Sequence, residues 1–469
     1  MVINMERSTY SVPFIRQRTD AFDAEHPLSV SVPGSKSITN RALLLATLAE
    51  GTSTLNGVLF SDDSRHFLSC IQTLGFETSV DEAARTIRVT GLGGQLPKKE
   101  ASLYVGSAGT AARFLSAYLG LSVDGTYHME SSAQMQKRPM APLLDSLKSL
   151  GCEIIYQGEE GHFPFTLKGH GFLRDRITIS IEESSQFLSA LLIVSCLAGQ
   201  DFVTCIDGTH GRAYVEMTIK MMEQFGVATV PLYYCSGNNE NHSCTGCINS
   251  SLPYAYRTPG GQHYHALEYL VPPDVSAACY FYAMSPLLNL PVRVENVHPG
   301  DSLMQGDIAF LSILEQMGCT TMDTAAGVVV LPPENGIYHG VTVDMSACSD
   351  QAITLAAIAP FADSPTTIHG IGHIRLQESD RIHAIVTELG KMGIRCEKIG
   401  DGIIIHPGMP APTAVETYED HRMAMGFSLI GLRAPGIVIN DPGCCRKTFE
   451  EYFETLDAVA EKLLYSSAK

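Results

Sequence analysis

Apolar stretches that open with polar or charged residues recur along the chain and predict a repeated helix. Each copy spaces its apolar residues as one face of a helix would. The six copies begin near Ser37, Thr110, Ser184, Ser276, Asp350 and His421. We therefore expect six related helices in successive parts of the chain.

A second helical pattern repeats in step with the first and ends in Leu-Gly or a similar pair. Its glycines are Gly75, Gly151, Gly226, Gly318 and Gly393, at intervals of 76, 75, 92 and 75 residues. A near-constant period indicates one structural unit used several times. The longer third interval indicates an insertion.

Each unit also contains strand patterns. STLNGV alternates after the first helix, SRHFLSCIQTLG has helical spacing, and FETSVDEAARTIRVTG reads as two short strands around a turn. Helices alternating with such strands predict an α/β protein in which helices cover sheets.

Six units of this length exceed what one core usually holds, so two domains of three units are expected. The sixth unit is incomplete at its C-terminal end, and strand-like residues before Val32 can complete it. We therefore predict one domain at residues 33–272. The second domain comprises residues 1–32 and 273–469, with crossings between the domains near Pro33 and Pro272.

Composition restricts the classes of function. The net charge of −18 has no offsetting basic stripe, which argues against nucleic-acid and membrane-surface binding. The longest apolar run, Phe187 to Gly199, is too short and too polar to span a bilayer. Thirteen scattered cysteines and the lack of a signal-peptide pattern predict a reduced, cytoplasmic protein.

The insertion is rich in Gly, Asn and Ser and contains Cys235, His242, Cys244 and Cys247. These residue types can bind zinc. Because no second closely spaced ligand pair accompanies them, a surface insertion with incidental thiols is the favoured interpretation, and zinc is the alternative.

Cations stand at or near several predicted helix starts, where they oppose the helix dipole unless an anion is bound. A lysine on a solvated face would be the ordinary explanation for one such case. The recurrence in an acidic protein favours an anionic ligand instead. The cations are Lys36, Arg41, Arg113, Arg138, Arg381, Arg422 and Lys447.

Several sequence blocks together resemble the 5-enolpyruvylshikimate-3-phosphate synthase family. They are VPGSKSITNRALLLATLAEG, GSAGTAARF, QKRPM, SSQFLSALL, DQAITLAAIAPFAD, ESDRIHAIVTELGKMG, EDHRMAMGFSL and KTFEEYFETL, from about Pro27 to Leu464. The resemblance implies a two-domain inside-out α/β fold with six βαβαββ repeats, three in each domain. It also implies transfer of the enolpyruvyl group of phosphoenolpyruvate to the 5-hydroxyl of shikimate 3-phosphate, with no metal or organic cofactor, in a monomer.

The resemblance implies specific residues for phosphoenolpyruvate and for the chemistry. Asp350 would accept the proton of the attacking hydroxyl, Glu378 would deliver a proton to the methylene carbon, and Lys36 can share this work. A purely local alternative for Asp350 is a helix N-cap. The phosphoenolpyruvate-binding positions would be Lys36, Gly109, Arg138, Gln186, Arg381, Arg422 and Lys447.

The acceptor positions match the family less completely. The family's serine-lysine pair is Gly211-Arg212 here, its asparagine is His373, and its lysine is Gln377. Arg212, His210 or His373 can supply part of the missing charge. The acceptor positions implied by the resemblance are Lys36, Ser37, Arg41, Ser184, Ser185, Gln186, Tyr214, Asp350, His373 and Gln377.

Three alternatives remain at this point. UDP-N-acetylglucosamine enolpyruvyl transferases use a loop cysteine, which HMESSAQMQKRPM lacks. A paralogous enolpyruvyl transferase acting on a related cyclic acceptor would explain the acceptor departures. The third alternative is a catalytically inactive binding protein, but such a protein would not need both carboxylates, those of Asp350 and Glu378.

Overall fold

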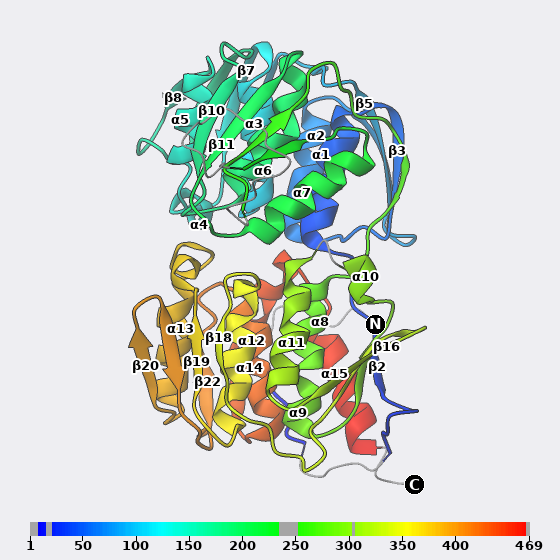
Figure 1. Ribbon diagram of the computed structural model, residues 1–469, viewed down its shortest axis with the longest axis vertical. Helices are drawn as coiled ribbons and strands as arrows, with labels where there is room; N and C mark the ends of the chain where they lie inside the picture. The colour runs from blue at the N-terminus through cyan, green and yellow to red at the C-terminus, as the bar shows by residue number, and fades with distance from the viewer. Residues whose placement is uncertain (1–7, 16–20, 234–251, 303–304, 466–469) are drawn as a thin grey trace. The chain divides into compact units, whose positions relative to one another are not determined.

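The computed structural model describes residues 8–15, 21–233, 252–302 and 305–465. Within these residues the chain divides into two compact units (Figure 1). Unit 1 contains residues 1–35 and 272–469, and unit 2 contains residues 36–271. The boundaries of the two predicted domains lie within a few residues of the boundaries of these units. We propose that each predicted domain corresponds to one unit.

Among its described residues, unit 2 contains three sheets of four strands each. The first has the order β14 (Glu268–Leu270), β3 (Glu50–Asn56), β5 (Thr86–Leu92) and β4 (Glu77–Asp81). The second has the order β6 (Glu100–Tyr104), β7 (Val123–Glu130), β9 (Phe165–His170) and β8 (Glu153–Tyr156). The third has the order β10 (Arg176–Ser180), β11 (Phe202–Asp207), β13 (Ala255–Thr258) and β12 (Val230–Leu232).

Unit 1 repeats this arrangement in its described residues, except that its third sheet has three strands. Its first sheet has the order β16 (Thr320–Thr324), β17 (Gly327–Leu331), β15 (Val292–Val294) and β2 (Leu28–Val30). Its second has the order β18 (Thr342–Asp344), β19 (Thr366–His369), β21 (Gly402–Ile405) and β20 (Cys396–Ile399). Its third has the order β1 (Thr9–Ser11), β23 (Ile437–Asn440) and β22 (Thr413–Val415). Every sheet contains one parallel pair, and its other pairs are antiparallel. The expected α/β fold with six repeats is confirmed.

The helices of unit 2 are α1 (Lys36–Leu48), α2 (Asp62–Thr73), α3 (Gly109–Gly120), α4 (Ala133–Gln136), α5 (Ala141–Ser149), α6 (Gln186–Val194), η1 (Ser195–Ala198) and α7 (Arg212–Gln224). Every residue of α3 is buried, whereas most of β4 is exposed. Helices that are apolar all round belong inside a core. The sheets of this unit therefore form its outer layer.

The helices of unit 1 are α8 (Val275–Tyr282), α9 (Met284–Leu288), α10 (Pro299–Ser302), η2 (Gly306–Ala309), α11 (Phe310–Gln316), η3 (Ser349–Gln351), α12 (Ala352–Ile358), η4 (Ala359–Phe361), η5 (Gly372–Leu376), α13 (Arg381–Lys391), α14 (His421–Arg433), η6 (Pro442–Lys447) and α15 (Tyr452–Tyr465). Helix α12 is wholly buried, and α14 is buried from His421 to Leu432.

The predicted helix boundaries agree with the structure. The six predicted starts fall within two residues of α1, α3, α6, α8, α12 and α14. The five repeated glycines follow α2, α5, α7, α11 and α13, all with positive φ angles between +80° and +116°. Glycine ends helices well because it adopts this left-handed region without a steric cost.

The N-terminal segment belongs to unit 1. Strand β1 pairs with β23, and β2 pairs with β15, so this segment supplies strands to two sheets formed mainly by the C-terminal half. The two crossing segments pair with each other: Ser35 N donates to Pro272 O at 2.9 Å, and Asp274 N donates to Pro33 O at 2.8 Å.

Candidate active site

In unit 1, four predicted site residues lie in or at the ends of helices. Asp350 lies in η3, Arg381 is the first residue of α13, Arg422 is the second residue of α14, and Lys447 ends η6. Aspartates cap the two long helices: Asp380 accepts from His383 N at 3.0 Å, and Asp420 accepts from Arg422 N at 3.0 Å. An N-cap side chain fixes where the first turn begins, so it also places the residue that follows.

Arg381 is the centre of this group. Its side chain is 1% exposed, and its guanidinium pairs with Asp350 Oδ1 at 2.9 Å and Glu378 Oε2 at 2.9 Å. Its Nε donates to Asp420 Oδ2 at 2.8 Å, and Nη1 donates to the amide oxygen of Gln377. Burial alone would lower the pKa of Arg381, but the charges of Asp420, Glu378 and Asp350 outweigh burial and raise that pKa.

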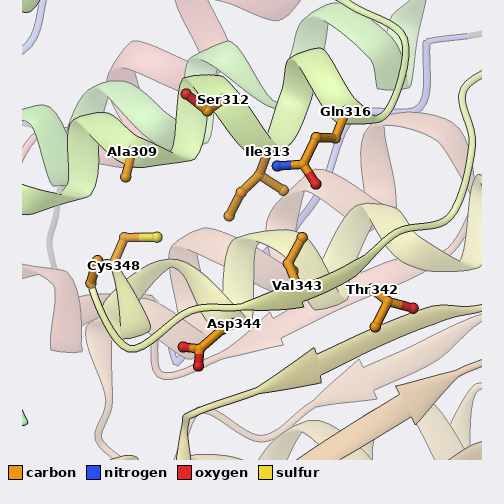
Figure 2. A pocket seen from close by; sticks show the side chains of 9 residues that line it. Ala309, Ser312, Ile313, Gln316, Thr342, Val343, Asp344 and Cys348 are labelled. Carbon is orange, nitrogen blue, oxygen red and sulfur yellow. The ribbon is translucent and has the colours of Figure 1, made fainter.

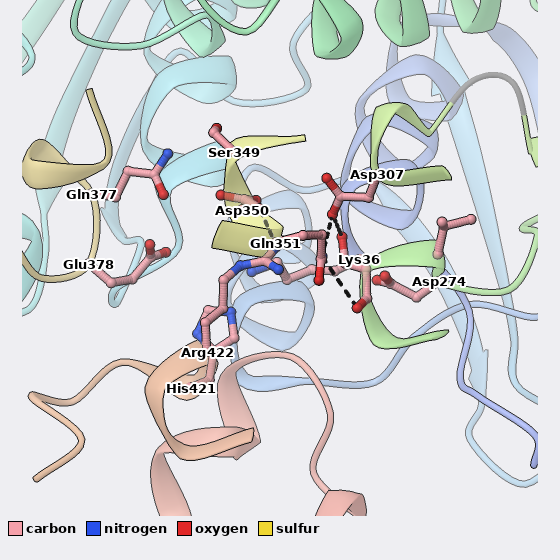
Figure 3. Close-up of polar contacts among 12 residues, drawn as sticks. Lys36, Asp274, Asp307, Ser349, Asp350, Gln351, Gln377, Glu378, His421 and Arg422 are labelled. Atoms are coloured by element: carbon pink, nitrogen blue, oxygen red, sulfur yellow. Dashed lines mark hydrogen bonds and ion pairs between the residues drawn. The ribbon is translucent and has the colours of Figure 1, made fainter. Parts of the chain in front are cut away.

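Two further cations complete the group, and Figure 3 shows one of them, Arg422, near Asp350 and Glu378. Arg422 Nη2 contacts Asp350 Oδ2 at 2.7 Å, so this carboxylate bridges two guanidinium groups. Lys447 Nζ lies 3.4 Å from Glu378 Oε1. The structure therefore joins both predicted catalytic carboxylates to one arginine and surrounds them with cations that can grip an anion.

The N-cap interpretation of Asp350 is wrong. The N-cap of α12 is Gln351, which makes no side-chain capping bond, and η3 begins without one as well. The carboxylate of Asp350 instead makes the two arginine contacts. Because those arginines start helices far along the chain, local sequence could not distinguish the two roles.

In unit 2, Arg41 is a buried cation held only by neutral groups. Its Nε donates to Thr218 Oγ1 at 2.7 Å, while Nη1 and Nη2 donate to the carbonyls of Ser37 and Tyr214 at 3.1 and 3.3 Å. The ion pairs of the described residues include none for Arg41, and burial lowers its pKa to about 10. A buried charge without a carboxylate partner is costly, so this arrangement is suited to an anionic ligand.

Two other predicted residues of unit 2 lie at the start of α3. A Cβ atom at Gly109 would lie 2.9 Å from Arg138 Nη1, and 2.9 Å from Nη1 of the buried Arg113. The absence of a side chain at Gly109 therefore lets the backbone approach the guanidinium of Arg138. Lys36, at the first residue of α1, pairs with Asp63 Oδ2 at 3.5 Å.

The remaining predicted residues of unit 2 surround the start of α6. Ser184 Oγ accepts from Gln186 N at 3.3 Å, and the amide oxygen of Gln186 is buried with no hydrogen-bond partner in the part of the chain that the structure describes. Ser185 packs over Gly211, where a Cβ atom would lie 2.5 Å from Ser185 Oγ. Gly211 has φ +62° and precedes α7, which carries Tyr214.

The departures from the family pattern have defined partners. Arg212 donates to the carbonyls of Pro253 and Gly208 at 2.8 and 2.9 Å. His210 Nε2 lies 3.2 Å from Glu182 Oε2, and His373 Nε2 lies 2.8 Å from Ser349 Oγ. Gln377 faces Arg381, and its amide oxygen accepts a hydrogen bond from Arg381 Nη1.

Two buried carboxyl groups were missed by the sequence analysis. Asp420 is fully buried and accepts a hydrogen bond from Arg381. The sequence signal that could have identified it is its position immediately before the start of α14. Asp307 accepts from Gln351 Nε2 at 2.8 Å and from Ser276 Oγ. Burial, and next the charge of Asp350, raise the pKa of Asp307 to about 6. No local pattern marks Asp307.

A shallow pocket of about 280 Å³ lies between α11 and the segment from β18 to η3 (Figure 2). None of the predicted site residues lines it. Within the described residues, no group of three or more His, Cys, Asp or Glu side chains is arranged to hold a metal ion. Cys235, His242, Cys244 and Cys247 lie outside the described residues. Among the described helices, none is both long and apolar enough to cross a membrane.

Comparisons with known proteins match nearly the whole chain. The family model described as EPSP synthase (3-phosphoshikimate 1-carboxyvinyltransferase) matches residues 27–456. A 3-phosphoshikimate 1-carboxyvinyltransferase of a Nostoc species is 41% identical over 446 residues, which cover 95% of this chain and 98% of the relative. A protein of Halalkalibacterium halodurans, named 3-phosphoshikimate 1-carboxyvinyltransferase 2, is 37% identical and covers 93% of each chain.

Solved structures agree with these relatives. An EPSP synthase structure from Acinetobacter baumannii superposes with a TM-score of 0.71 at 25% identity, covering 92% of this chain and 96% of that one. The similarity therefore extends over both compact units.

Proposed function

This chain belongs to the EPSP synthase family, and we propose that the two groups of residues described above carry out the family's reaction. The protein is a 3-phosphoshikimate 1-carboxyvinyltransferase with the two-domain inside-out α/β fold. It transfers the enolpyruvyl group of phosphoenolpyruvate to the 5-hydroxyl of shikimate 3-phosphate and releases phosphate. This step belongs to the shikimate pathway, which leads to chorismate and the aromatic amino acids.

The observation that best supports the site is the guanidinium shared by the two carboxylates. Asp350 and Glu378 each lie 2.9 Å from Arg381. In our proposal the 5-hydroxyl oxygen of the acceptor bonds to the enol carbon of phosphoenolpyruvate while Asp350 accepts the proton of that hydroxyl. Glu378 protonates the methylene carbon. Proton loss from the resulting methyl group and departure of phosphate then restore the double bond. Lys36 shares the proton transfer, and positioned acid–base groups of this kind typically contribute 10²- to 10⁴-fold.

The binding roles follow from charge. We propose that phosphoenolpyruvate, an anion with phosphate and carboxylate groups, is bound by Lys36, Gly109, Arg138, Gln186, Arg381, Arg422 and Lys447. Arginine suits both groups because its planar fork donates two parallel hydrogen bonds. The ion pairs of Arg422 and Lys447 with Asp350 and Glu378 would rearrange when the anion binds.

For the acceptor we propose Lys36, Ser37, Arg41, Ser184, Ser185, Gln186, Tyr214, Asp350, His373 and Gln377. The buried Arg41, whose partners in the described part of the chain are neutral, would be neutralised by an acidic group of the acceptor. Gln377 favours a second candidate, a related cyclic acceptor without the phosphate, because its amide bonds Arg381 and brings no positive charge.

Phosphate release from phosphoenolpyruvate tests the function when shikimate 3-phosphate, shikimate and quinate are compared side by side. We expect turnover with shikimate 3-phosphate to exceed that with the other two rings. Activity on shikimate or quinate alone would instead favour the second candidate.

The carboxylate roles are tested with Asp350→Asn and Glu378→Gln. Each should lower turnover by roughly two orders of magnitude or more, the usual scale for a general acid or base. Exposed Glu334, changed to Gln, provides a matched control that should retain full activity. Near-normal turnover in either site variant would remove that residue from the mechanism.

We also propose that the enzyme works as a cytoplasmic monomer without a metal or organic cofactor. The described cysteines are free thiols, and most are buried, as expected in a reducing compartment. Light scattering after gel filtration should give a mass near 50.7 kDa. Activity should survive treatment with a chelator, and a chelator-sensitive enzyme would revive the zinc alternative for the insertion.

A further inference from the structure

The loop that leads from β22 into α14 has an unfavourable backbone. Tyr418 and Glu419 have φ angles of +55° and +57°, so two consecutive residues other than glycine occupy the left-handed region. Side chains with a Cβ atom rarely adopt this conformation, and it persists only where surrounding contacts impose it. Asp420 and Arg422 follow directly, so this loop sets the position of two groups of the proposed site.

One buried carboxylate holds the first part of the loop. Glu388 of α13 is fully buried, and its Oε1 accepts from the Tyr418 hydroxyl at 2.6 Å. Its Oε2 accepts from Glu416 N at 3.2 Å, and Lys391 Nζ contacts both oxygens at 2.8 and 3.0 Å. Burial, and next the contact with Glu388, raise the pKa of Tyr418, so the phenol stays protonated and donates.

A second contact holds the end of the loop. Asp420 accepts from Arg381 Nε at 2.8 Å and from Ser379 Oγ at 3.0 Å. Arg381 and Glu388 are seven residues apart in α13, which corresponds to about two helical turns and places them on one face. Helix α13 therefore contacts the loop on both sides of Glu419, through Glu388 at Tyr418 and through Arg381 at Asp420.

We propose that Glu388 and Tyr418 are positioning residues for phosphoenolpyruvate binding, an inference that rests on the proposed function. This pair, the Glu388–Tyr418 clamp, imposes the left-handed loop. The loop in turn places Asp420 against Arg381 and starts α14 so that Arg422 faces Asp350. In this proposal the clamp acts on substrate binding only through the loop.

The test compares Tyr418→Phe with Tyr338→Phe. The Tyr338 hydroxyl donates to Ile358 O at 2.7 Å inside the core of the same unit, so its removal costs a similar buried hydrogen bond without affecting the loop. We expect Tyr418→Phe to raise the KM for phosphoenolpyruvate about tenfold and to leave the KM for shikimate 3-phosphate within about twofold. Tyr338→Phe should lower thermal stability and change neither constant.

Two further variants separate positioning from simple loss of stability. Glu388→Gln should act like Tyr418→Phe, because it weakens the acceptor and removes the charge paired with Lys391. Adding Glu419→Asn to Tyr418→Phe should recover much of the lost affinity, since asparagine tolerates the left-handed region better than glutamate. In the Tyr338→Phe background, Glu419→Asn should leave the KM for phosphoenolpyruvate unchanged, because Tyr338→Phe does not disturb the loop.

Arg422→Lys distinguishes this inference from the proposed function. If Arg422→Lys raises the KM for phosphoenolpyruvate while Tyr418→Phe behaves like Tyr338→Phe, the clamp is overturned and the proposed site stands. If Arg422→Lys leaves that KM unchanged, the proposed site is wrong and the clamp falls with it. A raised KM in both variants, with recovery by Glu419→Asn, supports both.

Discussion

Gln377 stands where the family has a lysine, and its amide oxygen accepts a hydrogen bond from Arg381 Nη1. A lysine cannot accept this bond, so Gln377→Lys changes two things at once. It removes an acceptor from Arg381, and it adds a cation for the acceptor's phosphate. Gln377→Met has a similar length without charge and isolates the first effect.

We expect Gln377→Lys to lower the KM for shikimate 3-phosphate up to tenfold relative to Gln377→Met, which corresponds to about 1.4 kcal/mol. The KM for phosphoenolpyruvate should differ little between the two variants. Steady-state kinetics with both substrates varied measures this. Equal constants for shikimate 3-phosphate in the two variants would mean that other groups already neutralise the phosphate.

Asp307 predicts a pH-dependent stability. Its pKa is raised from 3.8 to about 6, so between these values the folded protein binds a proton that the unfolded chain has lost. Stability from this group therefore falls as pH rises from about 4 to 6, and the cost is complete above that range. Groups facing Asp307 include Asp350 and Arg422, whose charges act in opposite directions.

Asp307→Asn removes the ionised form and should stabilise the protein by about 1–3 kcal/mol at pH 7.5 but far less at pH 4.5. Thermal unfolding at both values measures the difference from wild type. Exposed Glu334→Gln controls for a simple change of net charge. An equal effect of Asp307→Asn at the two values would show that Asp307 does not titrate in this window.

At the scale of secondary-structure elements, the helix starts carry the cations that we propose bind the substrates. At the start of α3, a methyl group on Gly109 would lie 2.9 Å from both Arg113 Nη1 and Arg138 Nη1. Gly120, at the other end of α3, offers a matched position: a Cβ there would lie 3.1 and 3.3 Å from atoms of Leu147 and Cys152, and its three nearest atoms all belong to these two residues.

Gly109→Ala should displace Arg138 and raise the KM for phosphoenolpyruvate by about tenfold or more, since a charge-assisted contact is weakened. Gly120→Ala should affect stability alone. Kinetics and thermal unfolding of both variants provide the comparison. A similar KM in both would show that the guanidinium of Arg138 moves aside without loss of binding.

At the scale of the whole molecule, the N-terminal segment joins two distant parts of the chain within unit 1. Tyr10 of β1 is buried and donates from its hydroxyl to Asp457 Oδ1 at 2.6 Å, while Val12 N donates to Ile437 O at 3.0 Å. Strand β1 also covers one edge of β23. These contacts make the segment part of the core of unit 1.

Deletion of residues 1–14 should therefore destabilise unit 1 by several kcal/mol, through loss of buried apolar area and of strand pairing. Hydrogen exchange should show reduced protection in β22, β23, α14 and α15, with unit 2 unchanged. Tyr10→Phe, which removes only the hydroxyl, should have a much smaller effect. Unchanged protection after the deletion would show that β1 is not needed for this sheet.

Local sequence patterns were enough to predict the helices and strands and their repetition. Helix starts and ends depend on local chemistry, such as an aspartate before α14 or a glycine after α13, and such signals are readable within a few residues. The repeat period indicated six units, and the strand-like N-terminus was expected to complete the last. The resemblance supplied the site residues, including Asp350, Glu378 and Arg381.

The contacts among these side chains could be read from the folded chain alone. It replaced the N-cap role of Asp350 with two arginine contacts, paired Gln377 with Arg381, and revealed Asp307 and the Glu388–Tyr418 clamp. These contacts join residues from separate segments of the chain. Their energies depend on burial and on distances of a few ångströms, and neither quantity has a signature in local sequence.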